Sequence, residues 1–285
     1  MNIIKINNIR HRLKSDFITC NLIGRLGNIM FQVAHAYAKS IEYNRQFFIS
    51  RHNNSIINHF EESLFKKINF LDIDLNNLNY ETIQGDFEYH HHVPNTITGT
   101  MYDGFYQSEK FFNNYSNVIR NLFSIPDLFY DEVVKNYEFL NNEVVACINV
   151  RRGRDYLDQP TRHPVVSSSY IYAAYEELPP HDKIVVLSDD PHWCKENIKL
   201  PNLIHVTEYT YDKALWFLSL CDHFIISNSS FSWWGSWLSL NPDKKIIAPS
   251  VWFGPELLKE ANPKDIYCHN WDIVNTRWVN GEIVV

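Results

Sequence analysis

The sequence predicts an α/β fold made of two units, and three observations support this prediction. The first is a short apolar segment near the N-terminus, followed by a glycine-containing turn and an amphipathic helix. The second is a regular alternation of apolar strands and helices through the second half of the chain. The third is that polar clusters follow several of these strands, where parallel α/β sheets bind their ligands. With 285 residues, the chain has the length of one large domain or two moderate ones.

The first unit begins with a strand, a turn and a helix. Residues 17–23 predict the strand, and residues 24–28 predict a turn that contains two glycines. From Ile29 to Tyr43 apolar residues recur at helical spacing, and the next strand is expected at 47–50. The rest of this unit is less regular. Its segments are expected as loops and short helices (53–100), an aromatic stretch (104–113) and two helices (114–123 and 131–140).

The second unit is expected to begin after a polar boundary at residues 141–143. Its strands are expected at 144–150, 183–187, 203–206, 224–227 and 245–248. Its helices are expected at 168–178, 191–198, 212–220 and 229–239. The first strand is almost wholly apolar, which is typical of a strand buried on both faces. This alternation predicts a doubly wound parallel sheet.

Composition limits the class of protein. Apolar residues make up 45% of the chain, which is enough for a substantial core. The net charge of −7 argues against nucleic acid as a partner. The five cysteines are widely spaced and form no C-x-x-C pair, which argues against a disulfide framework or a zinc site and indicates a reducing compartment. No apolar run has the length of a signal peptide or a membrane span, so a cytoplasmic location is expected, with at most a peripheral membrane association.

An arginine cluster follows the first strand of the second unit. Residues 151–154 contain three arginines, preceded by Asn149 and followed by Asp155. A guanidinium group offers a fork of donors that matches phosphate oxygens, so this cluster predicts an anion site. The alternative is a solvated loop in which Asp155 and Asp158 form salt bridges with the arginines.

Two further polar clusters follow later strands. Asp189 and Asp190 can bind metal, act as bases or accept hydrogen bonds from guanine, and the alternative is that one of them caps the helix after Pro191. Residues 227–235 form a strand-to-helix junction rich in hydroxyl groups, and free N–H groups at a helix N-terminus bind anions. The alternative here is a plain serine cap with Trp233 and Trp234 in the core.

The turn at residues 24–28 has two glycines, which let a backbone approach a ligand closely. It matches neither the dinucleotide-binding fingerprint nor a P-loop. The run at 90–92, three histidines, is interpreted as surface, and no metal site is predicted. Together the clusters predict a binding site for a nucleoside diphosphate.

Several segments carry a more specific signal because they occur in a fixed order. They are GRLGNIMFQ (24–32), GFYQSEKF (104–111), RRGRDY (151–156), SDD with WCKEN (188–197), SLCDH (219–223), NSSFSWWG (228–235), and AP with WF (248–253). These segments resemble the motifs of the α-1,2-fucosyltransferases of glycosyltransferase family 11, and the resemblance covers residues 20–255.

The resemblance implies a GT-B-like fold, with two Rossmann-like domains facing a cleft. Residues 1–143 would form the acceptor-side α/β domain, and residues 144–285 the domain that binds GDP-fucose. The implied reaction is an inverting transfer from GDP-β-L-fucose to the 2-hydroxyl of a galactose-containing oligosaccharide or lipid-linked glycan. No metal or other cofactor is expected. The alternatives are another linkage, acceptor or GDP-sugar, or a catalytically degenerate protein that binds a GDP-sugar or a glycan.

The resemblance also implies roles for single residues. Arg151 and Arg152 would neutralise the diphosphate as GDP leaves, and Asp189 or Asp190 would recognise guanine. The remaining residues expected to bind the donor are Gly27, Asn28, Asn149, Asn228, Ser229, Ser230 and Phe231.

Two departures from the family pattern stand out. Asn149 replaces a histidine, and Arg154 is inserted before Asp155. The candidates for a catalytic base are Asp155, Asp158 and His163, of which Asp155 is preferred because it lies nearest to the arginines.

Overall fold

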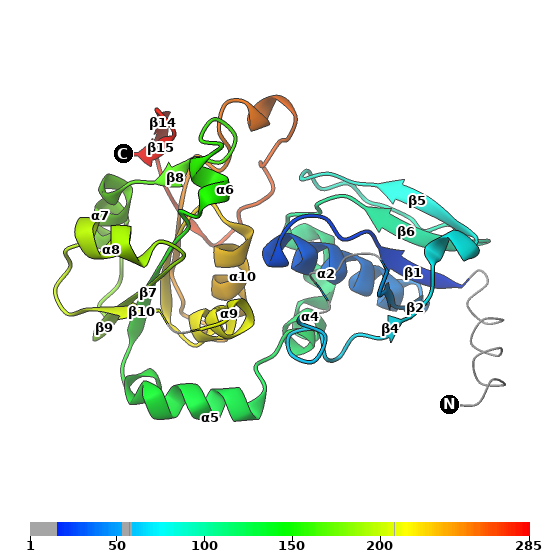
Figure 1. Ribbon diagram of the computed structural model, residues 1–285, viewed down its shortest axis with the longest axis horizontal. Helices are drawn as coiled ribbons and strands as arrows, with labels where there is room; N and C mark the ends of the chain where they lie inside the picture. The colour runs from blue at the N-terminus through cyan, green and yellow to red at the C-terminus, as the bar shows by residue number, and fades with distance from the viewer. Residues whose placement is uncertain (1–15, 53–56, 58, 208) are drawn as a thin grey trace. The chain divides into compact units, whose positions relative to one another are not determined.

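A computed structural model describes residues 16–52, 57, 59–207 and 209–285, which form two compact units (Figure 1). The first unit runs to Phe123 and also includes Lys264–Ile266, and the second comprises Ser124–Pro263 and Tyr267–Val285. Helix α5 (Asp127–Asn136) belongs to the second unit, because Phe129 packs on Trp216 with ring centroids 5.5 Å apart. The division into an acceptor-side domain to residue 143 and a donor domain from 144 stays a prediction.

The first unit is built on a four-stranded parallel sheet, in the order β2-β1-β6-β5. Its strands are β1 (Phe17–Cys20), β2 (Gln46–Phe47), β5 (Tyr80–Gln84) and β6 (Gly99–Asp103), and β3 (Ile49–Ser50) pairs separately with β4 (Phe70–Leu71). Its helices are α2 (Leu26–Glu42), α4 (Ser116–Leu122), and the short 3-10 turns η1 (Leu75–Asn77), η2 (Glu109–Phe111) and η3 (Asn113–Tyr115). Strand β1 is fully buried, and α2 buries most of its length. The predicted strand-turn-helix opening is therefore present.

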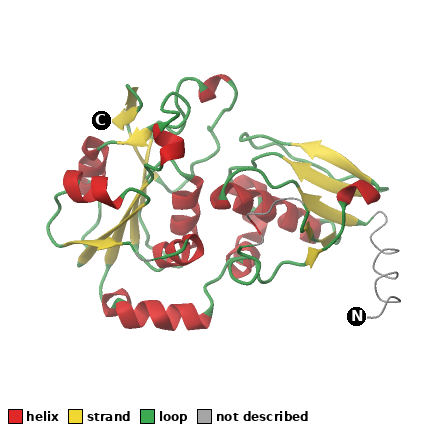
Figure 2. Ribbon diagram, viewed as in Figure 1, coloured by secondary structure: helices red, strands yellow, loops and turns green. Residues whose placement is uncertain are grey.

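The second unit contains a six-stranded, fully parallel sheet in the order β10-β9-β7-β11-β12-β13 (Figure 2). The strands are β7 (Val145–Val150), β9 (Lys183–Ser188), β10 (Leu203–Val206), β11 (His223–Ile226), β12 (Ile246–Pro249) and β13 (Asp272–Val274). A small second sheet joins β8 (Val165–Val166), β15 (Glu282–Val284) and β14 (Arg277–Val279).

Helices cover both faces of the six-stranded sheet. They are α7 (Ser168–Glu176) and α8 (Pro191–Asn197) on one face, and α9 (Tyr211–Ser219) and α10 (Ser230–Leu238) on the other (Figure 1). The short elements α6 (Arg154–Leu157), η4 (Glu138–Asn141) and η5 (Leu257–Lys259) complete the unit. Tyr170 of α7 lies in the core, where its hydroxyl donates to the carbonyls of Ile226 (2.8 Å) and Ile247 (3.2 Å). Trp233 and Trp234 of α10 are also fully buried, as the packing alternative proposed.

The structure adds elements that the sequence pattern did not predict. They include β5, β6, β8, α6 and the C-terminal strands β13 to β15. The strand expected at 47–50 is divided between β2 and β3, and the helix expected from Asp131 begins at Asp127. Part of the irregular segment 53–100 lies outside the described residues.

All five cysteines are buried, and none of them forms a disulfide bond. Among the described helices, none has both the length and the apolar character needed to cross a membrane.

Candidate active site

The six-stranded sheet places the candidate site at a point where its winding reverses. Numbered by their order along the chain, its strands lie in the order 3-2-1-4-5-6, which is the order of dinucleotide-binding folds. The first and fourth strands, β7 and β11, are neighbours, and the chain winds away from them in opposite directions. Ligands bind at such sheets beyond the carboxyl ends of these two strands.

The strand register brings three predicted clusters to that edge. Asn149 pairs with Ile226 of β11, and Val150 pairs with Ser188 of β9. The residues that follow these strands, including Arg151 and Asp189, therefore emerge side by side. The structure unites the arginine, aspartate and serine clusters in one site, although they are about 40 residues apart in the sequence.

The side chain of Asn149 links two elements of this site by hydrogen bonds. Its side-chain amide donates to the Leu187 carbonyl (3.2 Å) and accepts from the Ser232 hydroxyl (2.5 Å), and the residue is only 7% exposed. Ser227, which the sequence did not single out by itself, donates to the Asn149 carbonyl (2.8 Å) and accepts from the Arg151 backbone N–H (2.9 Å). The amide of Asn149 therefore ties β9 to α10, and it is engaged with protein atoms on both sides.

The Arg151 guanidinium lies between two carboxylates. It forms ion pairs with Asp155, one helical turn further on, and with Asp189 at the end of β9. It also lies 4.8 Å from the ring centroid of Tyr156. The salt bridge to Asp155 that the sequence left as an alternative is therefore present. These contacts fix the position of the Arg151 guanidinium, and the two carboxylates balance its positive charge.

Arg152 has different surroundings. Its guanidinium lies 4.0 Å from the Trp193 ring centroid, donates to the Val166 carbonyl (3.1 Å) and approaches Glu282 at 3.6 Å. Its Nε is buried and has no hydrogen-bond partner among the described residues. Burial lowers the pKa of Arg152, and Glu282 and then Asp190 oppose that shift. Arginine titrates so far above neutrality that the group stays charged.

The two adjacent aspartates divide the roles that the sequence offered for them. Asp190 caps α8 by accepting from the Trp193 backbone N–H (3.0 Å). Asp189 accepts from the Arg152 backbone N–H (2.7 Å) while it pairs with Arg151. Recognition of guanine by either carboxylate stays a prediction.

The start of α10 contributes the third cluster. Ser229 caps this helix by accepting from the Phe231 backbone N–H (3.3 Å), and Ser230 and Phe231 form its half-buried first turn. The amide of Asn228 donates to the carbonyls of Pro164 and Trp252, each at 2.9 Å. Its Oδ1 is buried without a hydrogen-bond partner in the described part of the chain. The helix N-terminus at the edge of the sheet is thus suited to an anion.

Tyr156 of α6 and His163 of the loop that follows adjoin this cluster. The Tyr156 hydroxyl donates to the Asn228 carbonyl (3.1 Å), which fixes the ring. The ring stacks on that of His163, with centroids 5.0 Å apart and planes at 26°. Burial lowers the pKa of His163, as do the nearby charges of Arg162 and Arg151, whereas Asp155 opposes the shift.

The predicted residues Gly27 and Asn28 belong to the first unit, at the start of α2. Asn28 accepts from the Gln107 side chain (2.8 Å), so the first two sequence motifs are joined. Gln32 holds the preceding loop through both backbone groups of Ile23, at 3.0 and 3.1 Å. The glutamines in these motifs therefore shape the loop, which the sequence reasoning had missed.

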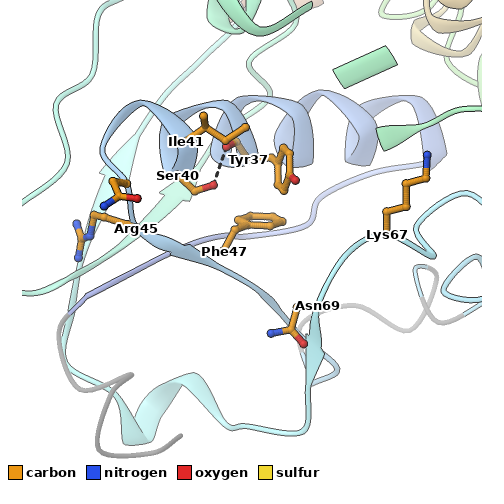
Figure 3. A pocket seen from close by; sticks show the side chains of 8 residues that line it. Tyr37, Ser40, Ile41, Arg45, Phe47, Lys67 and Asn69 are labelled. Atoms are coloured by element: carbon orange, nitrogen blue, oxygen red, sulfur yellow. Dashed lines mark hydrogen bonds between the residues drawn. The ribbon is translucent and has the colours of Figure 1, made fainter. Parts of the chain in front are cut away.

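The first unit also has an open hollow of about 370 Å³ along α2 (Figure 3). Tyr37, Phe47 and Lys67 are among its lining residues. The Lys67 ammonium donates to Asn121, and Arg45 donates to the carbonyls of Asn95 and Thr98. Its cations are thus engaged with protein oxygens, and we assign this hollow no ligand. In the described part of the chain, no three His, Cys, Asp or Glu residues are placed to hold a metal ion.

Comparison with known proteins identifies the family of this chain. The model of glycosyl transferase family 11 matches residues 2–275, so the chain belongs to that family. The chain is 27% identical over 297 residues to an alpha-1,2-colitosyltransferase of Escherichia coli, covering 87% of this chain and 96% of that protein. It is 26% identical over 289 residues to the O-antigen biosynthesis glycosyltransferase WbnK of Escherichia coli, with 81% and 93% covered.

A solved structure resembles the fold. The crystal structure of NodZ alpha-1,6-fucosyltransferase soaked with GDP-fucose matches with a TM-score of 0.52 at 13% identity, covering 79% of this chain and 93% of that one. Together with the parallel sheets of both units, this match confirms the predicted GT-B-like α/β class. The predicted cleft between the two domains stays a prediction.

Proposed function

We propose that this protein transfers L-fucose from GDP-β-L-fucose to the 2-hydroxyl of a galactose-containing glycan, with inversion and without a metal ion. The observation that carries the proposal is the pair Arg151 and Arg152, fixed at the end of β7 beside the N-terminus of α10. In a member of family 11, this arrangement suits a nucleoside diphosphate whose sugar is the group transferred.

The proposed chemistry follows from the charge that develops on GDP. As the bond from the anomeric carbon to the β-phosphate oxygen breaks, negative charge grows on the diphosphate. Arg151, Arg152 and the N–H groups at the start of α10 would stabilise that charge. These protein groups would supply the stabilisation that a divalent cation gives in other transferases.

In this proposal the acceptor is a free oligosaccharide or a lipid-linked glycan, and the protein works in the cytoplasm or at the cytoplasmic membrane surface. Five buried cysteines without a disulfide bond are consistent with a reducing compartment. Binding of the acceptor by the first unit is part of the same proposal.

A second donor is favoured by one specific observation, the similarity to an alpha-1,2-colitosyltransferase. Colitose is fucose without its 3-hydroxyl. A site that hydrogen-bonds a substrate hydroxyl rejects an analogue lacking it by about 10⁴-fold or more, whereas an apolar surface discriminates weakly. Comparing kcat/KM for the two GDP-sugars therefore identifies the donor.

The direct test is release of GDP from GDP-fucose in EDTA, with and without lactose or N-acetyllactosamine. Release stimulated by the acceptor supports the proposal, and methylation analysis of the product then gives the linkage. Faster release from GDP-colitose would reassign the donor. Binding of GDP without any turnover would indicate a degenerate binding protein, and no binding of GDP at all would contradict the donor site.

A matched pair of variants connects this test to the site. Arg152→Lys keeps the charge but loses the fork and the contact geometry on Trp193, so GDP affinity should fall at least tenfold. Arg154→Ala removes an exposed arginine two residues away and should leave GDP affinity within about twofold. Equal effects of the two variants would argue for a general electrostatic field instead of a built site.

A further inference from the structure

The transfer proposed above needs a group that accepts the proton of the acceptor hydroxyl. We propose that His163 is this base, an inference that rests on the proposed function. The sequence offered three candidates and preferred Asp155, because that residue lies nearest to the arginines.

The structure argues against Asp155 as the base. Both of its carboxylate oxygens accept from the Arg151 guanidinium. To reach an acceptor hydroxyl, the carboxylate would have to leave this ion pair, and Arg151 would lose a partner while it is needed at the diphosphate. Asp155 is better suited to orienting Arg151. Asp158 is exposed at the end of α6, and within the described residues its carboxylate forms no hydrogen bond or ion pair with the site.

His163 is held beside the same arginine and remains available. Its ring stacks on Tyr156, whose ring centroid lies 4.8 Å from the Arg151 guanidinium. Within the described residues, its ring nitrogens have neither a hydrogen-bond partner nor an ion pair. It is half-buried, so the ring is shielded in part from water without being sealed off.

The backbone on both sides of His163 is fixed to the site. The N–H of His163 donates to the Gln159 carbonyl (2.8 Å), and the carbonyl of the next residue, Pro164, accepts from the Asn228 amide (2.9 Å). The imidazole is therefore placed by the end of β11 and not by a free loop.

The protonation state of His163 suits a base. The charged groups around it are Arg162, Arg151 and Asp155, and Arg162 is itself paired with Glu260. Burial and the two arginines lower the pKa of His163, so the imidazole is neutral at pH 7. A neutral imidazole with a free nitrogen is the most common general base in enzymes.

In the proposed step, one proton is transferred and one bond at the anomeric carbon is exchanged for another. A ring nitrogen of His163 takes the proton of the acceptor hydroxyl, and the oxygen forms a bond to the anomeric carbon of the donor sugar. The bond from that carbon to the β-phosphate oxygen breaks and leaves its electron pair on GDP. The imidazolium of His163 subsequently gives its proton to water.

The test uses His163→Phe, which retains an aromatic ring for the stack on Tyr156 but cannot accept a proton. We expect kcat to fall by about 10² to 10⁴-fold, the usual contribution of a general base. GDP affinity and the KM for the donor should stay within about threefold. In the wild type kcat/KM should fall as the pH drops below 6.5, because His163 becomes protonated, and this acid limb should be absent from the variant.

Two further variants separate a base from a packing role. In His163→Gly, added imidazole should restore part of kcat, which a merely structural residue would not allow. His205→Phe is the matched control, because burial also lowers the pKa of His205, which lies on the edge strand β10, separated from β7 by β9. It should leave the rate and the pH profile unchanged.

The possible outcomes distinguish failure of the proposed function from failure of the proposed role of His163. A wild-type protein that shows no transfer to any acceptor contradicts the proposed function, and this inference with it. A wild type that transfers, with a His163→Phe variant of similar kcat and the same acid limb, overturns only the role of His163. Loss of the acid limb in Asp155→Asn but not in His163→Phe would return the role to Asp155.

Discussion

Single residues in the candidate site are arranged so that adjacent positions meet different surroundings. Successive side chains of an extended segment point in opposite directions. Arg151 therefore meets Asp155 and Asp189, whereas Arg152 meets Trp193 and the Val166 carbonyl. Two arginines that look equivalent in the sequence therefore have different contacts, Arg151 with two carboxylates and Arg152 with an aromatic ring and a backbone carbonyl.

A substitution at Gly153 tests whether GDP binding depends on the ion pairs of Arg151. A Cβ at this position would collide with the Arg151 guanidinium and the Asp189 carboxylate, which are mobile side-chain ends. Gly153→Ala should therefore lower GDP affinity about tenfold, equivalent to 1.4 kcal/mol. The free energy of unfolding should change by less than about 1 kcal/mol. Titration calorimetry and urea unfolding measure the two quantities, and unchanged GDP affinity would show that the ion pairs do not set the donor site.

His35 in the first unit predicts a loss of stability in acid. It is fully buried, its ring stacks on Tyr106 at 4.2 Å, and its Nε2 has no partner among the described residues. Burial, followed by the charge of Lys39, lowers the pKa of His35 well below 6.5. The unfolded chain then binds a proton that the folded chain does not.

This difference stabilises the fold above pH 6.5 and is lost as the pH falls below that value. Just below pH 6.5, we expect the free energy of unfolding to fall by about 1.4 kcal/mol for each step of one in pH. Urea unfolding at pH 7.5, 6.5 and 5.5 measures this slope. His35→Phe should flatten it, and the exposed control His59→Phe should not. Parallel slopes in all three proteins would rule out His35 as the cause.

At the scale of elements, the strands of the second half were predicted well because most of them are rich in buried apolar residues. Strands β7, β9, β10, β11 and β12 lie within one residue of their predicted bounds, since a mainly apolar run marks each one. Strand β5 was missed because its residues are exposed or half-buried and give no apolar pattern. The short strands β8 and β15 have too few residues to produce a periodic signal.

The candidate site also has features that could be predicted from the sequence and features that could not. Arginines and serines at strand ends were visible in the sequence, because topology alone places strand ends together. The ion pair of Arg151 with Asp189, 38 positions away, depends on side-chain geometry that no local pattern encodes. The same holds for Glu282, which reaches Arg152 from the C-terminal strand β15. Asp190 as a helix cap was predictable, since the following proline marks the helix start.

Packing of α10 against α9 gives a prediction at this scale. A Cβ on Gly235 would lie 2.7 Å from both Cβ and Cδ1 of Leu218, so the helices approach too closely for any larger residue. Alanine favours a helix over glycine by about 1 kcal/mol, but overpacking costs about 1 to 3 kcal/mol. Gly235→Ala should therefore destabilise the protein in urea unfolding. Ser236→Ala, a buried change on the same helix that adds no atoms, should have a smaller effect, and a stabilised Gly235→Ala would refute the close contact.

At the scale of the whole molecule, the first unit is not one continuous stretch of chain. Residues Lys264–Ile266 return to it from the second unit. Asp265 is 8% exposed and accepts from the Tyr89 backbone N–H (2.9 Å) and the Lys110 ammonium (2.5 Å). Burial alone would raise the pKa of Asp265, but the bonds from Lys110 and Tyr89 outweigh it and the pKa is lowered.

Asp265→Ala should destabilise the first unit by about 2 to 3 kcal/mol, because a buried charge-assisted pair is broken. All eight tryptophans lie in the second unit, so their fluorescence reports on that unit alone. We expect the circular dichroism transition to move to lower urea and the tryptophan transition to move less. Lys264→Ala, which removes an exposed ion pair with Glu88, should leave both transitions nearly unchanged. Equal shifts in the two signals would mean that Asp265 supports the whole molecule.

The returning segment Lys264–Ile266 also matters for the engineering of chimeras. If the first unit of another family member were grafted onto this second unit, a single crossover near residue 123 would replace Tyr89 and Lys110 but keep the parental Asp265. The chimera would then combine the Asp265 carboxylate with hydrogen-bond donors from another protein in place of Tyr89 and Lys110. A chimera intended to alter glycan choice should therefore exchange residues 264–266 together with the N-terminal stretch, as two pieces of one inherited unit.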